Sequence, residues 1–144
     1  MTIGRARSIL SGVWIFLATP LIAIVFFQTI NRKYDEWDTG FGWLTPLVFP
    51  VLSFIIATWT VAESREDRMV LKNTYVFVAS VVLSVFYLSL LYAILLSMPV
   101  EIKDFRDYVV SVMRPSLWYL GTIQAIVVVA VGKFFLEDIS GSQR

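Results

Sequence analysis

The chain has 144 residues, of which 58% are hydrophobic and only 16% are charged, whereas a soluble domain is closer to half apolar and about 25% charged. This composition predicts a membrane protein, and the near balance of 12 basic and 11 acidic residues argues against a nucleic-acid-binding surface. Cysteine and histidine are both absent, which excludes disulfides and thiol catalysis and leaves zinc and haem iron without their preferred ligands.

The first predicted element is an apolar run at residues 8–30, preceded by Arg5 and Arg7. A secretory signal peptide has a similar charge pattern, but its apolar centre has only about 7 to 15 residues and a small-residue cleavage motif follows it. The run in this chain is longer and is not followed by such a motif. We therefore predict a retained first transmembrane helix over 8–30, kinked at Pro20.

Two further apolar runs predict the second and third transmembrane helices, over 43–62 and 74–97. Each run is close to the roughly 20 residues that a helix needs to cross a bilayer. Pro46 and Pro50 would fall in the first turns of the second helix, where a missing backbone donor costs least.

The connection between these two helices, residues 63–73, has the densest cluster of charges in the chain. One interpretation of this cluster is a solvated turn. The other is a surface for a cytosolic protein partner, and its candidate residues are Arg65, Glu66, Asp67, Arg68 and Lys72.

Residues 100–114 carry the pattern of an amphipathic helix. The apolar positions recur at steps of three and four, opposite a charged side, and they are Ile102, Phe105, Val109 and Val112. We predict a separate helix that lies on the bilayer surface or against the bundle. A fourth transmembrane helix is predicted over 116–136.

Together these elements predict an all-α fold, a four-helix antiparallel transmembrane bundle that forms one domain over residues 1–144. The interfacial amphipathic helix would lie between the third and fourth spans, and the short connections would make neighbouring spans antiparallel. Lysine and arginine near the span ends show a small excess on the side of the chain termini. We expect contact with membrane lipid, both termini in the cytoplasm and a location in a bacterial inner membrane.

Small and polar residues form stripes along the predicted spans when they are placed at about 100° per residue. The first interpretation is a packing seam within the bundle or between copies, and the second is a water-filled path. The seam residues are Ser53, Ala57, Thr60, Ser80, Ser84, Tyr87, Gly121, Gln124, Ala125 and Gly132. Gln124 requires a partner, because an unpaired amide in hydrocarbon costs several kcal/mol.

Several aromatic residues lie near the predicted span ends, among them Trp14, Trp43, Trp118 and Tyr119. Indole and phenol rings favour the boundary between lipid and water. We therefore predict that these residues anchor the helices at the two membrane surfaces.

No ionisable residue lies at the centre of a predicted span, and the sequence contains no catalytic, phosphate-binding or metal-binding motif. No enzymatic activity and no cofactor are therefore expected. The first functional hypothesis is a small membrane subunit that anchors, senses or signals, as a homo-oligomer or with a cytosolic partner. Prokaryotic stress and antiviral defence systems are a setting in which small four-span proteins occur. The alternative hypothesis is an oligomeric channel or membrane-disrupting effector with a hydroxyl-lined path.

Overall fold

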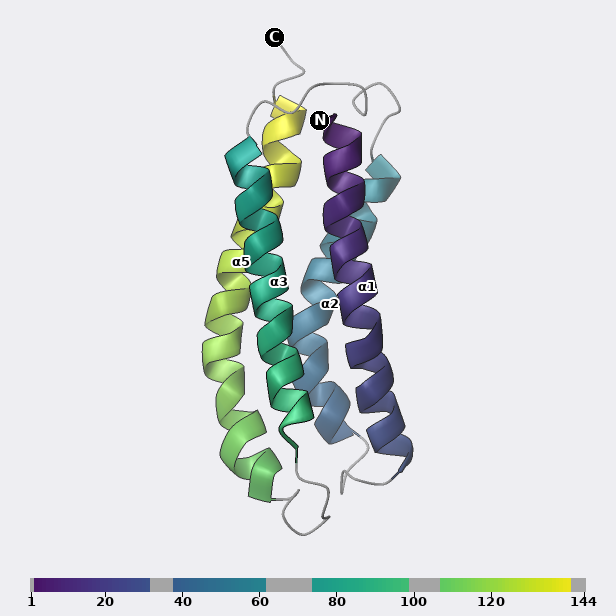
Figure 1. Cartoon of the computed structure of the whole chain (residues 1–144), viewed down its shortest axis with the longest axis vertical. Helices are drawn as coiled ribbons and strands as arrows, with labels where there is room; N and C mark the ends of the chain where they lie inside the picture. Colours follow the sequence, from purple (N-terminus) through teal and green to yellow (C-terminus); the bar gives the residue numbers. More distant parts are fainter. Residues whose placement is uncertain (1, 32–37, 62–73, 99–106, 141–144) are drawn as a thin grey trace.

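The computed structural model describes residues 2–31, 38–61, 74–98 and 107–140, and it is helical throughout these ranges apart from their ends (Figure 1). The elements are α1 (Ile3–Ile30), α2 (Asp38–Val61), α3 (Thr74–Leu96), the short π-helix η2 (Val109–Met113) and α5 (Arg114–Ser140). Four helical segments are long and apolar enough to cross a membrane. The described residues thus confirm the predicted all-α class with four candidate spans.

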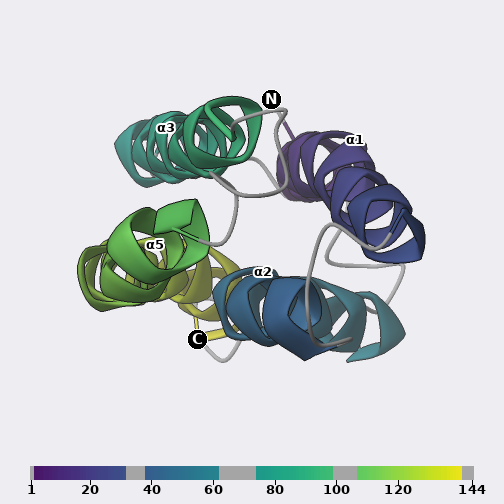
Figure 2. The same ribbon diagram turned by 90° about the horizontal axis from the view of Figure 1, so that it is seen from below.

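The four long helices lie side by side along the long axis of the molecule, and the start of α1 and the end of α5 are at the same end (Figure 1). Viewed along this axis they form a four-sided arrangement (Figure 2), in which α1 packs against α2 and α3, and α5 packs against the same two helices. The consecutive helices α2 and α3 occupy opposite corners. The order around the bundle therefore differs from the order along the chain.

Helix α1 begins at Ile3, earlier than the predicted residue 8. The Thr2 side chain accepts a hydrogen bond from the Arg5 backbone N–H at 3.4 Å, which caps the first turn. The early start carries Arg7 into the packed end of the bundle, where 7% of its surface is exposed. Its guanidinium carbon lies 5.7 Å from the centre of the Phe135 ring, a favourable contact between a cation and an aromatic face.

Helix α2 begins at Asp38, well before the predicted residue 43, so Pro46 and Pro50 lie inside the helix. Their predicted position in the first turns was wrong, because the helix starts in polar sequence that the apolar pattern does not mark. A proline inside a helix removes one backbone donor and bends the helix. The carbonyl four residues before each proline then needs a donor from elsewhere.

The predicted separate helix over 100–114 is wrong for the part that the structure describes, because residues 107–140 form one continuous helical run. Within η2 the Arg114 backbone N–H bonds to the Val109 carbonyl, across a wider turn than an α-helix makes. Pro115 follows directly and has no N–H to donate. The wide turn accommodates this proline, and the helix continues into the fourth span without a break.

Large side chains fill the interior of the bundle. The largest fully buried ones are Trp14, Tyr87, Phe135, Leu10, Leu21, Leu44, Leu47, Ile55, Leu88, Leu91, Met113 and Leu120. The outer surface is also apolar, and Phe16, Leu96 and Trp118 are 78%, 73% and 85% exposed. Soluble monomers rarely carry an apolar exterior of this extent, whereas hydrocarbon as the solvent would suit it.

Candidate functional site

Polar side chains cross the interior of the bundle and donate to groups on other helices. Gln124 of α5 is 8% exposed, and its amide Nε2 donates to the Pro46 carbonyl of α2 at 2.8 Å. This carbonyl is the one that the N–H of residue 50 would bond in a regular α-helix, and residue 50 is a proline. Gln124 therefore supplies the donor that α2 lacks.

Two tyrosines of α3 also donate to backbone carbonyls in proline-containing turns, one in the same turn of α2 and one in α1. The Tyr87 hydroxyl donates to the Leu47 carbonyl of α2, and the Tyr92 hydroxyl donates to the Leu17 carbonyl of α1, both at 2.8 Å. Each acceptor lies three residues before a proline of its own helix, in the turn that a proline opens. Helix α3 thus contacts proline-containing turns of both α1 and α2.

Two indole rings lie inside the bundle and not at its surface. Trp14 Nε1 donates to Ser84 Oγ, and Trp43 Nε1 donates to Ser116 Oγ, both at 2.9 Å. The prediction that Trp14 and Trp43 are surface anchors was wrong, because serines on neighbouring helices satisfy their N–H groups. Trp118, by contrast, is exposed.

A further contact joins α3 to α5. Ser80 Oγ lies 2.8 Å from the Val76 carbonyl of its own helix and 3.0 Å from the Ala130 carbonyl of α5. Because Ser80 is fully buried, its hydroxyl has no access to water and depends on these acceptors.

The predicted seam residues divide into three groups. Ser80, Ser84, Tyr87 and Gln124 are buried within the bundle, and Gly121 and Gly132 are half-buried. Ser53, Ala57 and Ala125 are exposed, so they do not lie in a packing seam within one chain. The placement of the Thr60 side chain is outside what the structure describes.

The outward position of Ser53 follows from the face that α2 buries. Leu44, Leu47, Val51 and Ile55 recur at helical spacing on that face, and residue 53 is turned away from it. On α5 the buried position is 124, and Ala125 is rotated by about 100° from it. A prediction from residue size alone could not identify the buried face.

The other predicted sites are described only in part. The charged residues of the predicted partner loop lie outside the described residues, and they are Arg65, Glu66, Asp67, Arg68 and Lys72. Ile102 and Phe105 of the predicted amphipathic face also lie outside them. Val109 of that face is buried and Val112 is half-buried, as parts of the continuous fourth helical run.

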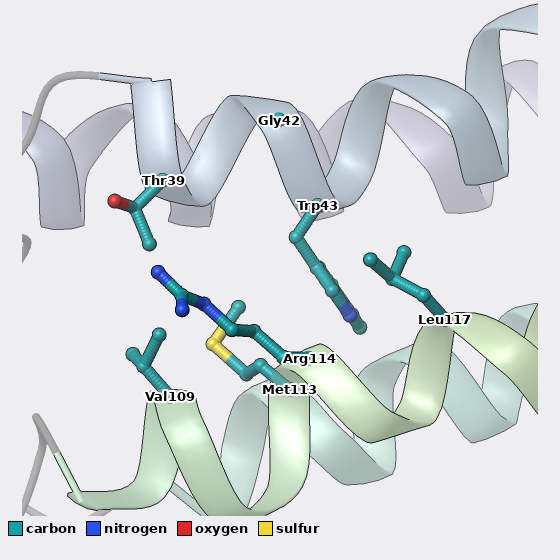
Figure 3. A pocket seen from close by; sticks show the side chains of 7 residues that line it. All are labelled: Thr39, Gly42, Trp43, Val109, Met113, Arg114 and Leu117. Atoms are coloured by element: carbon teal, nitrogen blue, oxygen red, sulfur yellow. The ribbon is translucent and has the colours of Figure 1, made fainter.

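A cavity of about 210 Å³ opens where α2 and the run of η2 and α5 begin (Figure 3). Its lining residues are Thr39, Gly42, Trp43, Val109, Met113, Arg114 and Leu117. The Arg114 guanidinium extends between Thr39 and Val109, and Trp43 and Leu117 form the other side. Among the described residues that line the cavity, which are mostly apolar, Arg114 is the one that carries a charge.

The hydrogen bonds described here join neighbouring helices of the bundle. Among the described residues, no cluster of three or more histidine, cysteine, aspartate or glutamate side chains could hold a metal ion. No family model, curated protein or solved structure matches this chain. The contacts inside the bundle and the cavity at its end are therefore the features on which a functional proposal rests.

Proposed function

We propose that this protein is a non-enzymatic membrane subunit with four spans, each antiparallel to the next along the chain, and that it anchors, senses or signals through its surfaces. The observation that carries the proposal is the difference between the interior of the bundle and its outer surface. Inside, the buried polar groups described above donate to other helices. Outside, the surface is apolar. We propose that a molecule with this difference acts through what its surfaces contact.

The hydroxyl groups on the outer surface support lipid contact. Thr19, Ser89 and Thr122 are exposed, and each hydroxyl donates to the carbonyl four residues earlier in its own helix, at 2.7, 2.7 and 3.0 Å. A hydroxyl bonded within its own helix can face hydrocarbon without leaving a donor unsatisfied. These residues therefore do not need a water-filled path.

The interior weighs against a channel through one bundle. Trp14 and Tyr87 are fully buried and fill the centre, and the hydroxyls of Ser80, Ser84 and Tyr87 are already hydrogen-bonded. A channel would therefore have to form between copies of the chain. We propose a homo-oligomer or a cytosolic partner as the means by which the subunit acts, with the 63–73 connection as the partner surface.

The proposed topology places both termini in the cytoplasm of a bacterium and the protein in its inner membrane. Because the chain has no cysteine, single cysteines can be introduced without background. We expect Asp104→Cys to react with an impermeant maleimide in intact cells and Gln143→Cys to react only after permeabilisation. Labelling of Gln143→Cys from outside in intact cells would contradict this topology.

The proposed function is tested by two measurements on the purified full-length protein. We expect no steady conductance in a planar bilayer, and we expect a cytosolic protein to co-purify with the wild type. That protein should be lost from the double variant Arg65→Glu and Arg68→Glu but retained by Arg5→Glu, the matched charge control. A steady conductance from the wild type, with no co-purifying protein, would support the channel instead.

A further inference from the structure

We propose that the cavity between α2 and the start of the fourth helical run binds one anionic phospholipid, whose phosphate is held by Arg114. This inference rests on the proposed membrane location. It deepens that proposal by naming a lipid class and the residues that would select it. Three properties of the cavity favour such a lipid: its position along the helices, its charge and its shape.

The position of the cavity along the helices matches the level of the lipid headgroups in a membrane. The two candidate spans that border it extend over Thr39–Ala57 and Val109–Phe135. The cavity is lined by residues from the first turns of both spans. In a membrane these turns lie where the hydrocarbon core meets the headgroups. A lipid whose phosphate is bound at Arg114 would therefore place its acyl chains beside the apolar side chains of the helices.

The charge of the cavity favours a phosphate. A guanidinium group presents a planar set of donors that matches phosphate oxygens, and it is only weakly hydrated. The Arg114 side chain is exposed and directed into the cavity (Figure 3). Basic pockets between transmembrane helices on the cytoplasmic side bind anionic lipid headgroups; in the proposed topology this cavity lies at the opposite end, so its lipid would come from the outer leaflet.

The shape of the cavity accommodates part of a lipid. A volume of about 210 Å³ is below the roughly 300 to 1,000 Å³ of pockets that enclose a drug-sized ligand, so it would admit the phosphate and glycerol region. The Trp43 N–H is bonded to Ser116, which leaves the indole ring as an apolar wall. Leu117 and Met113 complete that wall.

The test is native mass spectrometry of the full-length protein in detergent micelles, titrated with phosphatidylglycerol or with phosphatidylcholine. We expect one phosphatidylglycerol molecule per chain to be retained at concentrations where phosphatidylcholine is not. Arg114→Gln should weaken this retention about tenfold, because it removes one charge-assisted contact. Arg5→Gln, which removes an exposed arginine of α1, is the control and should not weaken it.

A second pair of variants tests the cavity without changing charge. A Cβ atom at Gly42 or at Gly12 would meet nothing within 4 Å, so both positions accept a larger side chain. Gly42 lines the cavity and Gly12 does not. We expect Gly42→Leu to fill the cavity and reduce phosphatidylglycerol retention, while Gly12→Leu leaves it unchanged.

Several outcomes would overturn the inference. Equal retention by wild type, Arg114→Gln and Gly42→Leu would exclude the cavity as a lipid site. Displacement of the lipid by millimolar inorganic phosphate would identify a general anion site instead. Flotation of each variant with liposomes distinguishes failure of the lipid site from failure of the proposed function. A protein that inserts into liposomes but retains no phosphatidylglycerol contradicts only the lipid site. A wild type that does not insert contradicts both the lipid site and the proposed membrane function.

Discussion

At the scale of single residues, side chains of other helices donate to carbonyls in the proline-containing turns of the bundle. Gln124 donates to the Pro46 carbonyl, which has no donor from Pro50, and Tyr92 donates to the Leu17 carbonyl, three residues before Pro20. An unsatisfied buried carbonyl costs more than a hydrogen bond normally contributes. These donors should therefore be more sensitive to substitution than the outward hydroxyls of the same helices.

Gln124→Leu keeps a side chain of similar size but leaves the Pro46 carbonyl without its donor. We expect the free energy of unfolding to fall by about 1 to 3 kcal/mol, measured by denaturant titration in mixed micelles with circular dichroism. Thr122→Val is the matched control on α5, because its hydroxyl bonds within its own helix. It should change the free energy by less than about 0.5 kcal/mol.

A double-mutant cycle identifies the reason for that loss. Pro50→Ala restores a backbone N–H four residues after Pro46, so the carbonyl regains a donor within α2. In that background Gln124→Leu should cost less, with a coupling free energy of about 0.5 kcal/mol or more. Equal losses in both backgrounds would show that Gln124 stabilises the bundle by packing and not through the carbonyl.

At the scale of elements, the four candidate spans could be predicted because long apolar runs have few alternatives to helix in a membrane. Their starts could not be predicted from hydropathy. Helix α1 begins at the Thr2 cap, and α2 begins at Asp38 in polar sequence. The wide turn of η2 joins a segment with an amphipathic pattern to the fourth candidate span, so the predicted separation between residues 114 and 116 does not occur.

The start of the fourth helical run is tied to the last turn of α3. The Tyr108 hydroxyl donates to the Ile94 carbonyl at 2.7 Å, one of the carbonyls that have no donor within their own helix end. Burial raises the pKa of the Tyr108 phenol above its usual 10.0; a hydrogen bond with Ser97 lowers it and the nearby Tyr119 raises it. The folded protein therefore retains this proton to higher pH than the unfolded chain does.

The pH dependence follows from this difference. The contribution of Tyr108 is complete below the unfolded pKa of about 10 and is lost as the pH rises through the raised folded value. We expect Tyr108→Phe to reduce stability at pH 8 by about 1 kcal/mol and to make the decline above pH 10 less steep. Thermal unfolding in detergent at a series of pH values measures both, and Tyr75→Phe, at a residue that is 88% exposed, should show neither effect.

At the scale of the whole molecule, the order of helices around the bundle decides which partners meet. The chemistry of Gln124 indicated that it needs a partner, but its acceptor on α2 depends on α2 and α5 being neighbours. The same helix order makes α1 and α3 neighbours, so the Trp14 indole N–H can donate to the Ser84 hydroxyl. Helix order is a property of the packed bundle, so neither contact could be predicted from periodicity along one helix.

The proposed exterior is tested by quenching of tryptophan fluorescence in bilayers of lipids brominated on their acyl chains. Trp118 is 85% exposed and Trp14 is fully buried, so contact quenching should reach the first ring and not the second. We expect the quenched fraction to fall more in Trp118→Phe than in Trp14→Phe. If Trp118→Phe leaves the quenched fraction unchanged in a protein that floats with liposomes, this face of α5 is covered. A second copy of the chain would then be the proposed cover, because the homo-oligomer requires such a surface.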